Sequence, residues 1–510
     1  MGRASRFFHL ALAAQALGVS CLKPNIRAES NRDGVVDVQN SPDSGNMALW
    51  TSQHGAIFLP NIGDKHMRCT HADAVGNPWS NDELSACHDA SGHILLAPEY
   101  AAPLKTLPLN VSADALRVGI TMGINGRELV TNTSTWDGLV TVRFDVTDGI
   151  THASDAVALR MAPVLTHNHL QSVETLLSTA SNASDPIQLN FVQQLDDARE
   201  EAGITTPLLL FNQSSDVWAQ DFIEPGYASM PGPNGPISIP LRGPGIGGFQ
   251  PSSGSGSGFG RREINSYGNL ETIPPYTSKS GVSYKAGRII MDKHFDQLPA
   301  RALLDFFYAQ QVQTPLVLET GWLLIGHVDE FVQFLPYNND LGFTISIADT
   351  ESAIILDVLA NTPFADVNAY AQRHIDSNLQ TLLSEIPLDP ADVIRVPTLF
   401  HDPGYVFSMS WGSDGLPPLI EPVMEGERKL MAFYPASINR IVIGKRYLSP
   451  KPWGPVVNGM DVLASAVERA YARAGMSVGW VDDYLSHHVG AGEIHCGSNT
   501  FRQTDLVWWD

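Results

Sequence analysis

The hydrophobic rhythm of the chain changes near residue 166, and this change constrains the fold more than any other feature of the sequence. Between residues 28 and 165, apolar and polar residues alternate in segments such as ALRVGITMGI, ELVTNT and LVTVRFDVT, which are separated by NG, DG and Pro/Ser turns. Alternation of this kind is typical of half-buried strands. Residues 28–165 are therefore predicted to form a β-sandwich.

After residue 166, helical periods alternate with short apolar strands. The predicted helices include VETLLSTA, RALLDFFYAQQ and DVLASAVERAYARAG, and the predicted strands include PLLLFN, PLVLET and FTISIA. Such alternation favours an α/β architecture, so the chain is predicted to be a multidomain α+β protein with an α/β domain over 166–510. The Gly/Ser/Pro-rich run 243–260 is predicted to be a flexible loop or a mobile lid. No sequence repeat of 20–50 residues is visible.

The N-terminal residues 1–25 have the pattern of a secretory signal peptide. Arg3 and Arg6 precede an apolar run that ends in small residues. The run is too short to cross a bilayer as a mature helix, and no later segment approaches the required length. We therefore expect a secreted, extracellular protein without a membrane span.

The charge of the chain is strongly acidic. It contains 54 Asp and Glu residues against 32 Lys and Arg, a formal net charge of −22. Nucleic-acid binding needs a basic footprint, so this composition argues against nucleic acid as a partner. Cationic partners or metal cations are favoured instead.

Cysteine is scarce, with four residues in the chain: Cys21, Cys69, Cys87 and Cys496. Cys21 lies in or beside the predicted signal, and export would allow Cys69 and Cys87 to form a short-range disulfide. Cys496 then has no partner. An unpaired thiol in an exported protein is either a reactive group or a buried, inert side chain, and composition alone leaves both interpretations open.

Polar residues form three clusters inside otherwise apolar stretches of the second domain. The clusters are DVWAQDFIE (216–224), GHVDE (326–330) and GEIHCG (492–497). A cysteine, a histidine and carboxylates can supply a nucleophile, a general acid/base and orienting groups. The residue order of papain-like hydrolases is absent. Zinc ligation and purely structural hydrogen bonding are alternative interpretations, although no CxxC or HExxH spacing supports zinc.

Five separated motifs occur in one order: DVWAQDFIEPGY, SYGNLETIPP, GWLLIGHVDEF, SPKPWGPVVNG and GEIHCGSNT. Together they resemble the catalytic domain of the protein-arginine deiminase family, and GAIFLPN and NRDGVVD resemble that family's central β-sandwich. The chain thus resembles an exported, shorter member of the family. The resemblance implies an immunoglobulin-like β-sandwich followed by a pentein, a five-bladed α/β propeller whose site lies at the central axis.

The resemblance implies that Cys496 is the nucleophile and His327 the general acid/base. It implies that Asp221 and Asp329 hold a guanidinium group in bidentate fashion. A guanidinium carbon is a poor electrophile because its positive charge is delocalised. We expect the carboxylates to favour the cationic form of His327, and neighbouring cations or a helix N-terminus to stabilise the thiolate of Cys496.

Two further residues are predicted to bind substrate. Trp218 would line the methylene stem of an arginine side chain, although a core tryptophan is an open alternative. Arg242, in PLRGPG, is the nearest candidate for an arginine that grips the substrate backbone.

Calcium is the cofactor that the resemblance implies. The side chains of Gln220, Glu224 and Glu271 and the backbone carbonyls of Tyr267 and Leu270 correspond to one calcium site of the family. A set made only of oxygen ligands suits this hard cation.

The predicted function is calcium-dependent hydrolysis of arginine side chains in peptides or proteins to citrulline and ammonia, through a thiouronium intermediate on the cysteine. This would be a hydrolase acting on C–N bonds in linear amidines. The alternatives are deimination of free arginine, agmatine or a C-terminal arginine, and a non-catalytic protein that binds arginine-containing peptides.

Overall fold

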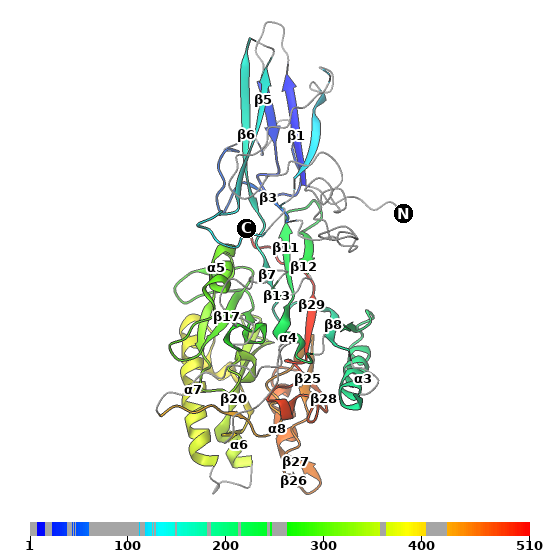
Figure 1. Ribbon diagram of the computed structural model, residues 1–510, viewed down its shortest axis with the longest axis vertical. Helices are drawn as coiled ribbons and strands as arrows, with labels where there is room; N and C mark the ends of the chain where they lie inside the picture. The colour runs from blue at the N-terminus through cyan, green and yellow to red at the C-terminus, as the bar shows by residue number, and fades with distance from the viewer. Residues whose placement is uncertain are drawn as a thin grey trace, which may run out of the picture. The chain divides into compact units, whose positions relative to one another are not determined.

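The fold is described from a computed structural model of the chain (Figure 1). The described residues are 8–15, 23–37, 43, 45, 47–60, 112, 118–124, 126, 129–147, 150–180, 185–212, 216–241, 245–246, 263–356, 364–403 and 426–509. The predicted Cys69–Cys87 disulfide and the 243–260 insert, apart from 245–246, lie outside them.

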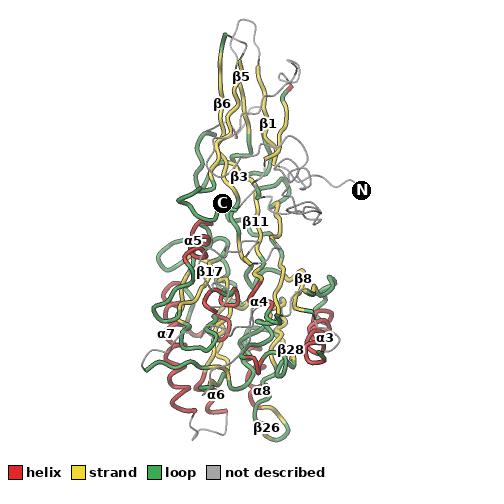
Figure 2. The backbone as a smooth tube through the Cα atoms, viewed as in Figure 1, coloured by secondary structure: helices red, strands yellow, loops and turns green. Residues whose placement is uncertain are grey.

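The chain divides into two compact units. Unit 1 comprises Met1–Pro163, Ala228–Leu241 and Trp509–Asp510, and unit 2 comprises Val164–Tyr227 and Arg242–Trp508. The described residues of unit 1 are mainly strand, turn and loop, whereas the longer helices belong to unit 2 (Figure 2).

Unit 1 contains two three-stranded sheets, with strand orders β2-β1-β4 and β3-β6-β5. Their strands are β1 Phe8–Gln15, β2 Lys23–Arg27, β4 Ile120–Ile124, β3 Ala56–Phe58, β6 His152–Met161 and β5 Leu139–Thr147. The segment LVTVRFDVT forms β5, as its alternation predicts, and pairs with β6 in an antiparallel register. The immunoglobulin-like topology stays a prediction. So does the signal peptide, within whose residues β1 lies.

Unit 2 is built from a supersecondary unit that recurs in four three-stranded sheets. In each sheet the central strand pairs antiparallel with one neighbour and parallel with the other. The sheets, written in strand order, are β14 Glu271–Ile273, β17 Arg288–Lys293 and β18 Leu316–Glu319; β19 Val332–Pro336, β20 Phe343–Asp349 and β21 Ile394–Pro397; β24 Ile441–Ile443, β25 Arg446–Pro450 and β28 Ser477–Val481; and β29 Ser498–Arg502, β8 Val173–Thr179 and β9 Leu209–Phe211.

Helices connect the parallel strands of every one of these sheets, as a parallel crossover requires. In chain order they are α3 Pro186–Glu201, α5 Arg301–Gln310, α6 Thr350–Leu356 with α7 Phe364–Glu385, and α8 Val462–Ala472. The predicted helices RALLDFFYAQQ and DVLASAVERAYARAG are confirmed as α5 and α8.

One sheet joins the beginning of unit 2 to its end. Its antiparallel edge strand β29 comes from the C-terminal region, whereas β8 and β9 come from the first part of the unit.

The shorter elements of the chain are β7 Leu165–Thr166, β10 Ile223–Glu224, β11 Gly226–Met230, β12 Ile237–Leu241, β13 Gly245–Ile246, β15 Tyr276–Thr277, β16 Ser283–Tyr284, β22 Phe400–His401, β23 Met431–Ala432, β26 Val456–Val457, β27 Met460–Asp461 and α4 Ala219–Phe222.

Two predicted elements are wrong. VETLLSTA is strand β8 rather than a helix, because it pairs with strands on both sides and buries Leu176 and Leu177. Tertiary pairing therefore outweighs its helical period. In ELVTNT, the stretch 129–133 is loop and turn instead of strand, because the Asn132 side chain accepts a hydrogen bond from the backbone N–H of Ser134 at 2.8 Å, as in an Asx turn.

A large apolar core lies against the sheets of β17 and β20 and along α7. Trp322, Phe331, Phe334 and Phe343 are fully buried in it. Burial of each large apolar side chain contributes roughly 1.5–3 kcal/mol. In the described part of the chain, none of the helices is both long and apolar enough to cross a bilayer.

Candidate active site

Three short loops and turns of unit 2 carry the predicted catalytic residues. Asp221 lies in α4, Asp329 in the 3₁₀ turn Val328–Glu330, and Cys496 just before β29. The backbone N–H of Gln220 donates to the carbonyl of Cys496 at 3.0 Å, so α4 is tied directly to the cysteine loop. The fold brings these residues together although they are far apart in the sequence.

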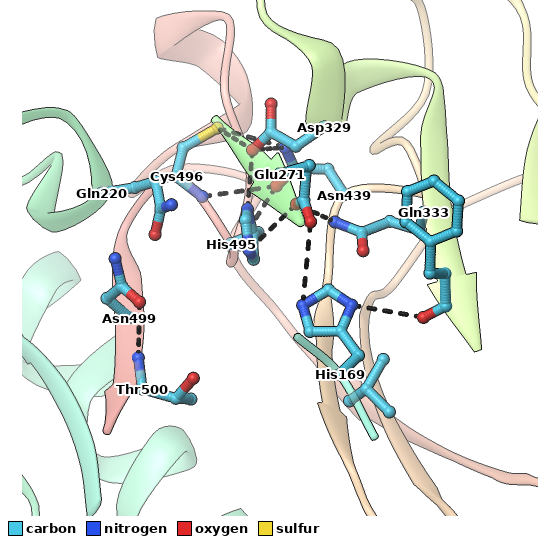
Figure 3. Close-up of polar contacts among 12 residues, drawn as sticks. His169, Gln220, Glu271, Asp329, Gln333, Asn439, His495, Cys496, Asn499 and Thr500 are labelled. Atoms are coloured by element: carbon cyan, nitrogen blue, oxygen red, sulfur yellow. Dashed lines mark hydrogen bonds and ion pairs between the residues drawn. The ribbon is translucent and has the colours of Figure 1, made fainter. Parts of the chain in front are cut away.

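Cys496 is a free, buried cysteine whose side chain is surrounded by polar groups (Figure 3). Its sulfur accepts from Asn439 Nδ2 at 3.2 Å and lies 3.5 Å from Asp329 Oδ2. Asn439 Oδ1 accepts from the backbone N–H groups of His495 and Cys496 at 3.1 and 3.4 Å. Asn439 therefore fixes both the backbone and the side chain of the cysteine.

Asp329 has no exposed surface, and its two oxygens differ in their surroundings. Oδ2 accepts from Asn439 Nδ2 at 2.8 Å and lies 2.7 Å from Nδ1 of His495. Oδ1 is buried and has no hydrogen-bond partner among the residues that the structure describes, and the same holds for Oδ1 of Asp221. Each of the two carboxylates predicted to bind a guanidinium group thus has one oxygen that can accept a hydrogen bond from a donor outside the described residues.

His327 lies between two acidic side chains. Its Nδ1 is 3.9 Å from Asp221 Oδ1, and its Nε2 is 3.7 Å from Glu263 Oε2. The carboxylate of Glu330 accepts from the backbone N–H groups of Gly326 and His327 at 3.0 and 2.8 Å, which holds the turn.

The surroundings of Gly268 explain why the SYGNLE motif has a glycine at this position. A Cβ at this position would lie 2.4 Å from Asp221 Oδ1 and 2.7 Å from His327 Nδ1. Any side chain at position 268 would displace Asp221 and His327, so only glycine allows the backbone to lie this close to them.

Burial controls the proton affinities in the site. It lowers the pKa of His327 to about 4, although the charge of Asp329 acts in the opposite direction. Burial also raises the pKa of the Cys496 thiol well above its usual range, and the charges of Asp329 and Asp221 raise it further. At neutral pH the imidazole is therefore neutral and the thiol protonated.

These directions correct two expectations from the sequence. The carboxylates were expected to favour the cationic form of His327, but desolvation outweighs Asp329. Cations or a helix N-terminus were expected beside the sulfur of Cys496, whereas the neighbouring charges that act on it are the carboxylates of Asp329 and Asp221. Burial also raises the pKa of Asp221 well above its usual range, with Glu263 and Asp216 adding to the rise.

Of the two further residues predicted to bind substrate, Trp218 lies among the described residues and Arg242 does not. Trp218 is buried beside the cysteine loop, because a Cβ on Gly492 would lie 2.4 Å from Cζ3 of Trp218 and 3.3 Å from the Cβ of Cys496. Arg242 lies outside the described residues.

Two of the predicted calcium ligands, Gln220 and Glu224, contact each other. Gln220 Nε2 donates to Glu224 Oε2 at 3.0 Å, and Asn499 Nδ2 donates to the same oxygen at 3.1 Å. Burial raises the pKa of Glu224 to about 8, and the charge of Glu271 contributes to the rise.

The remaining predicted ligands follow one another along the chain. Glu271 begins β14, and burial raises its pKa to about 7. It accepts from Gln333 Nε2 at 2.6 Å. The backbone N–H of Leu270 donates to the carbonyl of Tyr267 at 3.1 Å, so the turn that carries both predicted carbonyl ligands leads directly into Glu271.

Two residues of the site were not predicted: Asn439 and Glu263. Asn439 was detectable as a polar residue immediately before the apolar strand RIVIGK. Glu263 had no spacing signal, and Glu330 was seen in the cluster GHVDE, but its hydrogen bonds that hold the turn were not. His495 was seen beside the cysteine, but its contact with Asp329 was not. Burial lowers the pKa of His495, but the hydrogen bond with Asp329 and the charge of Glu271 outweigh it and raise the pKa.

The match to a family model and the similarity to curated relatives agree on one family. The sequence model described as "Protein-arginine deiminase (PAD)" matches residues 151–356 and 351–510. The chain is 29% identical to protein-arginine deiminase type-1 of Homo sapiens over 422 residues, covering 73% of this chain and 60% of that protein. It is 28% identical to the type-4 enzyme of Mus musculus over 400 residues, covering 70% and 56% of the two chains.

The chain therefore spans 60% or less of the length of these two relatives. Among solved structures, the agmatine deiminase of Enterococcus faecalis is 13% identical, with 67% of this chain and 96% of that chain covered and a TM-score of 0.36.

Proposed function

Because the chain belongs to the protein-arginine deiminase family, we propose that it hydrolyses arginine side chains of peptides and proteins to citrulline and ammonia. The observation that supports this proposal best is the pair of carboxylates beside a buried thiol. Asp221 and Asp329 each have a buried oxygen without a hydrogen-bond partner among the described residues. A planar guanidinium has donors enough to bind both.

Specificity for a cation would follow from the same two carboxylates. A neutral side chain such as glutamine would leave negative charge buried without compensation, which is costly. The positive charge of arginine would compensate it. It would also favour ionisation of the Cys496 thiol, whose pKa is raised by burial and, to a smaller extent, by the charges of Asp329 and Asp221.

The proposed reaction begins when the thiol of Cys496 transfers its proton to His327, which is neutral in the free site. The sulfur then forms a bond to the guanidinium carbon. One C–N bond breaks, and His327 gives the proton to the nitrogen that leaves as ammonia. In the second half, His327 takes a proton from water, whose oxygen bonds to the same carbon. The S–C bond breaks, the thiolate takes the proton held by His327, and the second proton of the water is lost to solvent, where it converts ammonia to ammonium as neutral citrulline is released.

Calcium binding is proposed for the set Gln220, Glu224 and Glu271 with the carbonyls of Tyr267 and Leu270. The residues fit this cation: the carboxylates of Glu224 and Glu271 are buried, and the Oε1 atom of Gln220 is buried without a hydrogen-bond partner in the described part of the chain. Bound calcium would neutralise the carboxylates. Because Gln220 precedes Asp221, these ligands would hold Asp221 in place.

The test is an assay of ureido product from an arginine-containing peptide, with calcium and with a chelator. We expect product with calcium, at least about a hundredfold less with the chelator because Asp221 is misplaced, and none from Cys496→Ala. An unchanged rate in Cys496→Ala would contradict the mechanism, and an unchanged rate with the chelator would contradict the calcium requirement alone.

The choice of a peptide substrate needs its own comparison. We expect an internal arginine in a peptide to react faster than free arginine, agmatine or a C-terminal arginine. Equal rates on all of them would contradict the peptide preference while leaving deimination intact.

The pentein arrangement and secretion are also part of the proposal. The four sheets with the same strand order, one of them joining the two ends of unit 2, support a ring of blades. Export of the chain would be checked by the N-terminal sequence of the protein recovered from the medium, which should begin after the predicted signal at 1–25.

A further inference from the structure

A second cluster of potential ligands lies beside the candidate active site. It consists of His169, Glu271 and His495, all buried, with one ligand atom from each lying within 4.8 Å of the others (Figure 3). His169 follows β7 and belongs to none of the motifs seen in the sequence. His495 precedes the cysteine.

The two imidazoles have the same kind of hydrogen-bond partner at Nδ1. Nδ1 of His169 lies 3.2 Å from the carbonyl oxygen of Phe334, and Nδ1 of His495 lies 2.7 Å from Asp329 Oδ2. Both partners are acceptors, so each Nδ1 carries the ring proton. Nε2 is then the atom of each ring that is available to a metal.

Both Nε2 atoms face the same carboxylate. That of His169 is 3.9 Å from Glu271 Oε2, and that of His495 is 3.6 Å from Glu271 Oε1. Histidine ligands in metal sites usually donate their other ring nitrogen to a carboxylate or a backbone carbonyl, as both rings do here. The distances between the ligand atoms and the hydrogen bonds at Nδ1 of both rings therefore both favour a metal site.

We propose that His169, Glu271 and His495 bind a divalent cation of the zinc class. Two imidazole nitrogens and one carboxylate are a ligand set that zinc accepts, with Zn–N distances of about 2.0–2.1 Å. Ligand atoms around such an ion lie roughly 3.3 Å apart. Side-chain movements of the order of 1 Å would close the cluster to this size, and any proton between His495 and Glu271 would be displaced.

The buried charges around the cluster permit a cation. Glu224, Glu271 and Asp329 are buried carboxylates, whereas Arg440 and Arg502 are buried cations that oppose metal binding. The guanidinium of Arg502 donates to Thr500, Gln171 and Val442 and is therefore committed to other acceptors. That of Arg440 lies 3.8 Å from the ring centre of Tyr447.

This site differs in chemistry from the proposed calcium site, although the two share Glu271. Calcium is bound by oxygen ligands and not by imidazole nitrogen. Loss of His169 should therefore weaken zinc binding without a comparable effect on calcium. Zinc binding would depend on the positions of these three side chains and is independent of whether the chain deiminates arginine.

The first experiment titrates zinc alone into the chelator-treated full chain by calorimetry at pH 7.5. We expect one site in the unaltered protein and an affinity at least about tenfold lower in His169→Gln, which removes one ligand. His167→Gln is the matched control, because His167 is a buried imidazole two positions away that lies outside the cluster. An equal affinity in His169→Gln and the unaltered chain would overturn the proposal.

The second experiment replaces zinc by cobalt, whose visible spectrum reports its ligands, and does not depend on whether His169→Gln folds. We expect visible bands of a four-coordinate ion without a thiolate charge-transfer band, and the same spectrum in Cys496→Ala. A thiolate band that disappears in Cys496→Ala would place the metal on the cysteine and overturn the assignment. Absence of metal binding in the unaltered protein would overturn it as well.

Discussion

Asp329 is the residue on which most contacts of the site converge. One of its oxygens meets His495, Asn439 and the sulfur of Cys496, and the other is buried without a partner among the described residues. A single carboxylate therefore orients its neighbours and remains open to a ligand. The two oxygens keep these different surroundings because the side chain is fully buried and cannot rotate into solvent.

Removing the imidazole of His327 should separate catalysis from stability. We expect His327→Gln to lower the rate of ureido-product formation by about 10²–10⁴-fold, the usual contribution of a general acid/base. The rate is measured at saturating peptide, and His152→Gln, on an exposed histidine of β6, serves as the control. A loss below tenfold would contradict the role assigned to His327.

Glu330 should make stability fall as pH rises. Burial raises its folded-state pKa from 4.5 to about 8. A raised carboxyl pKa means that the folded state holds a proton that the unfolded state has lost. The stabilisation is therefore complete below pH 4.5 and is lost as pH rises through about 8.

Glu330→Gln should flatten this dependence, because its amide oxygen can still accept from Gly326 and His327. The measurement is the melting temperature of each variant between pH 5 and 9, with exposed Asp366→Asn as the control. Identical slopes for Glu330→Gln and the unaltered chain would contradict the prediction.

At the scale of elements, the turn Tyr267–Asn269 and α4 meet where two predicted catalytic groups lie. The turn approaches so closely that only glycine fits at position 268. Neither element is longer than four residues, so neither is stable alone. Their positions depend on packing: Ala219 and Ile223, at the two ends of α4, share a buried cluster with Phe501 of β29.

Gly268→Ala tests this close approach. The added methyl group would displace Asp221 and His327, and we expect the rate of deimination to fall by about 100-fold, the typical effect of a misplacement of this size. The control is Gly45→Ala, because a Cβ on Gly45 would meet nothing within 4 Å. Retention of full activity by Gly268→Ala would show that the turn can move without harm.

The four α/β sheets could be predicted as elements but not as a repeat. The helices α5 and α8 and strands such as β9, β18 and β20 follow from hydrophobic period. Their common strand order does not, because the helices between parallel strands differ in length, from α6 with 7 residues to α7 with 22. The error at VETLLSTA has the same origin, since pairing with β29 comes from a segment at the far end of unit 2.

At the scale of unit 2, the chain closes on itself through β29. This strand supplies an edge to the sheet of β8 and buries Phe501 against α4 and β8. Cys496, the predicted nucleophile, precedes this strand by two positions. The pairing that closes the unit therefore also positions the predicted nucleophile.

A chain that ends at Gly497 keeps Cys496 but lacks β29. We expect it to lose cooperative thermal unfolding, since β8 would expose unpaired backbone groups and the cluster around Phe501 would be lost. Circular dichroism would compare it with a chain that ends at Asp505, which keeps β29. A cooperative transition at an unchanged temperature in the shorter chain would contradict this view of the fold.

The sequence by itself determined which residues are candidates for the chemistry, because the motifs around Asp221, His327, Asp329 and Cys496 are short and local. It also determined helices such as α5 and α8 and strands such as β18 and β20, since each of them has its own hydrophobic period. Only the tertiary structure decided the rest: the contacts of Asn439, the cluster at His169, the repeated sheets and the protonation of the thiol. Burial and charge at a side chain depend on neighbours hundreds of residues away, and no local pattern records them.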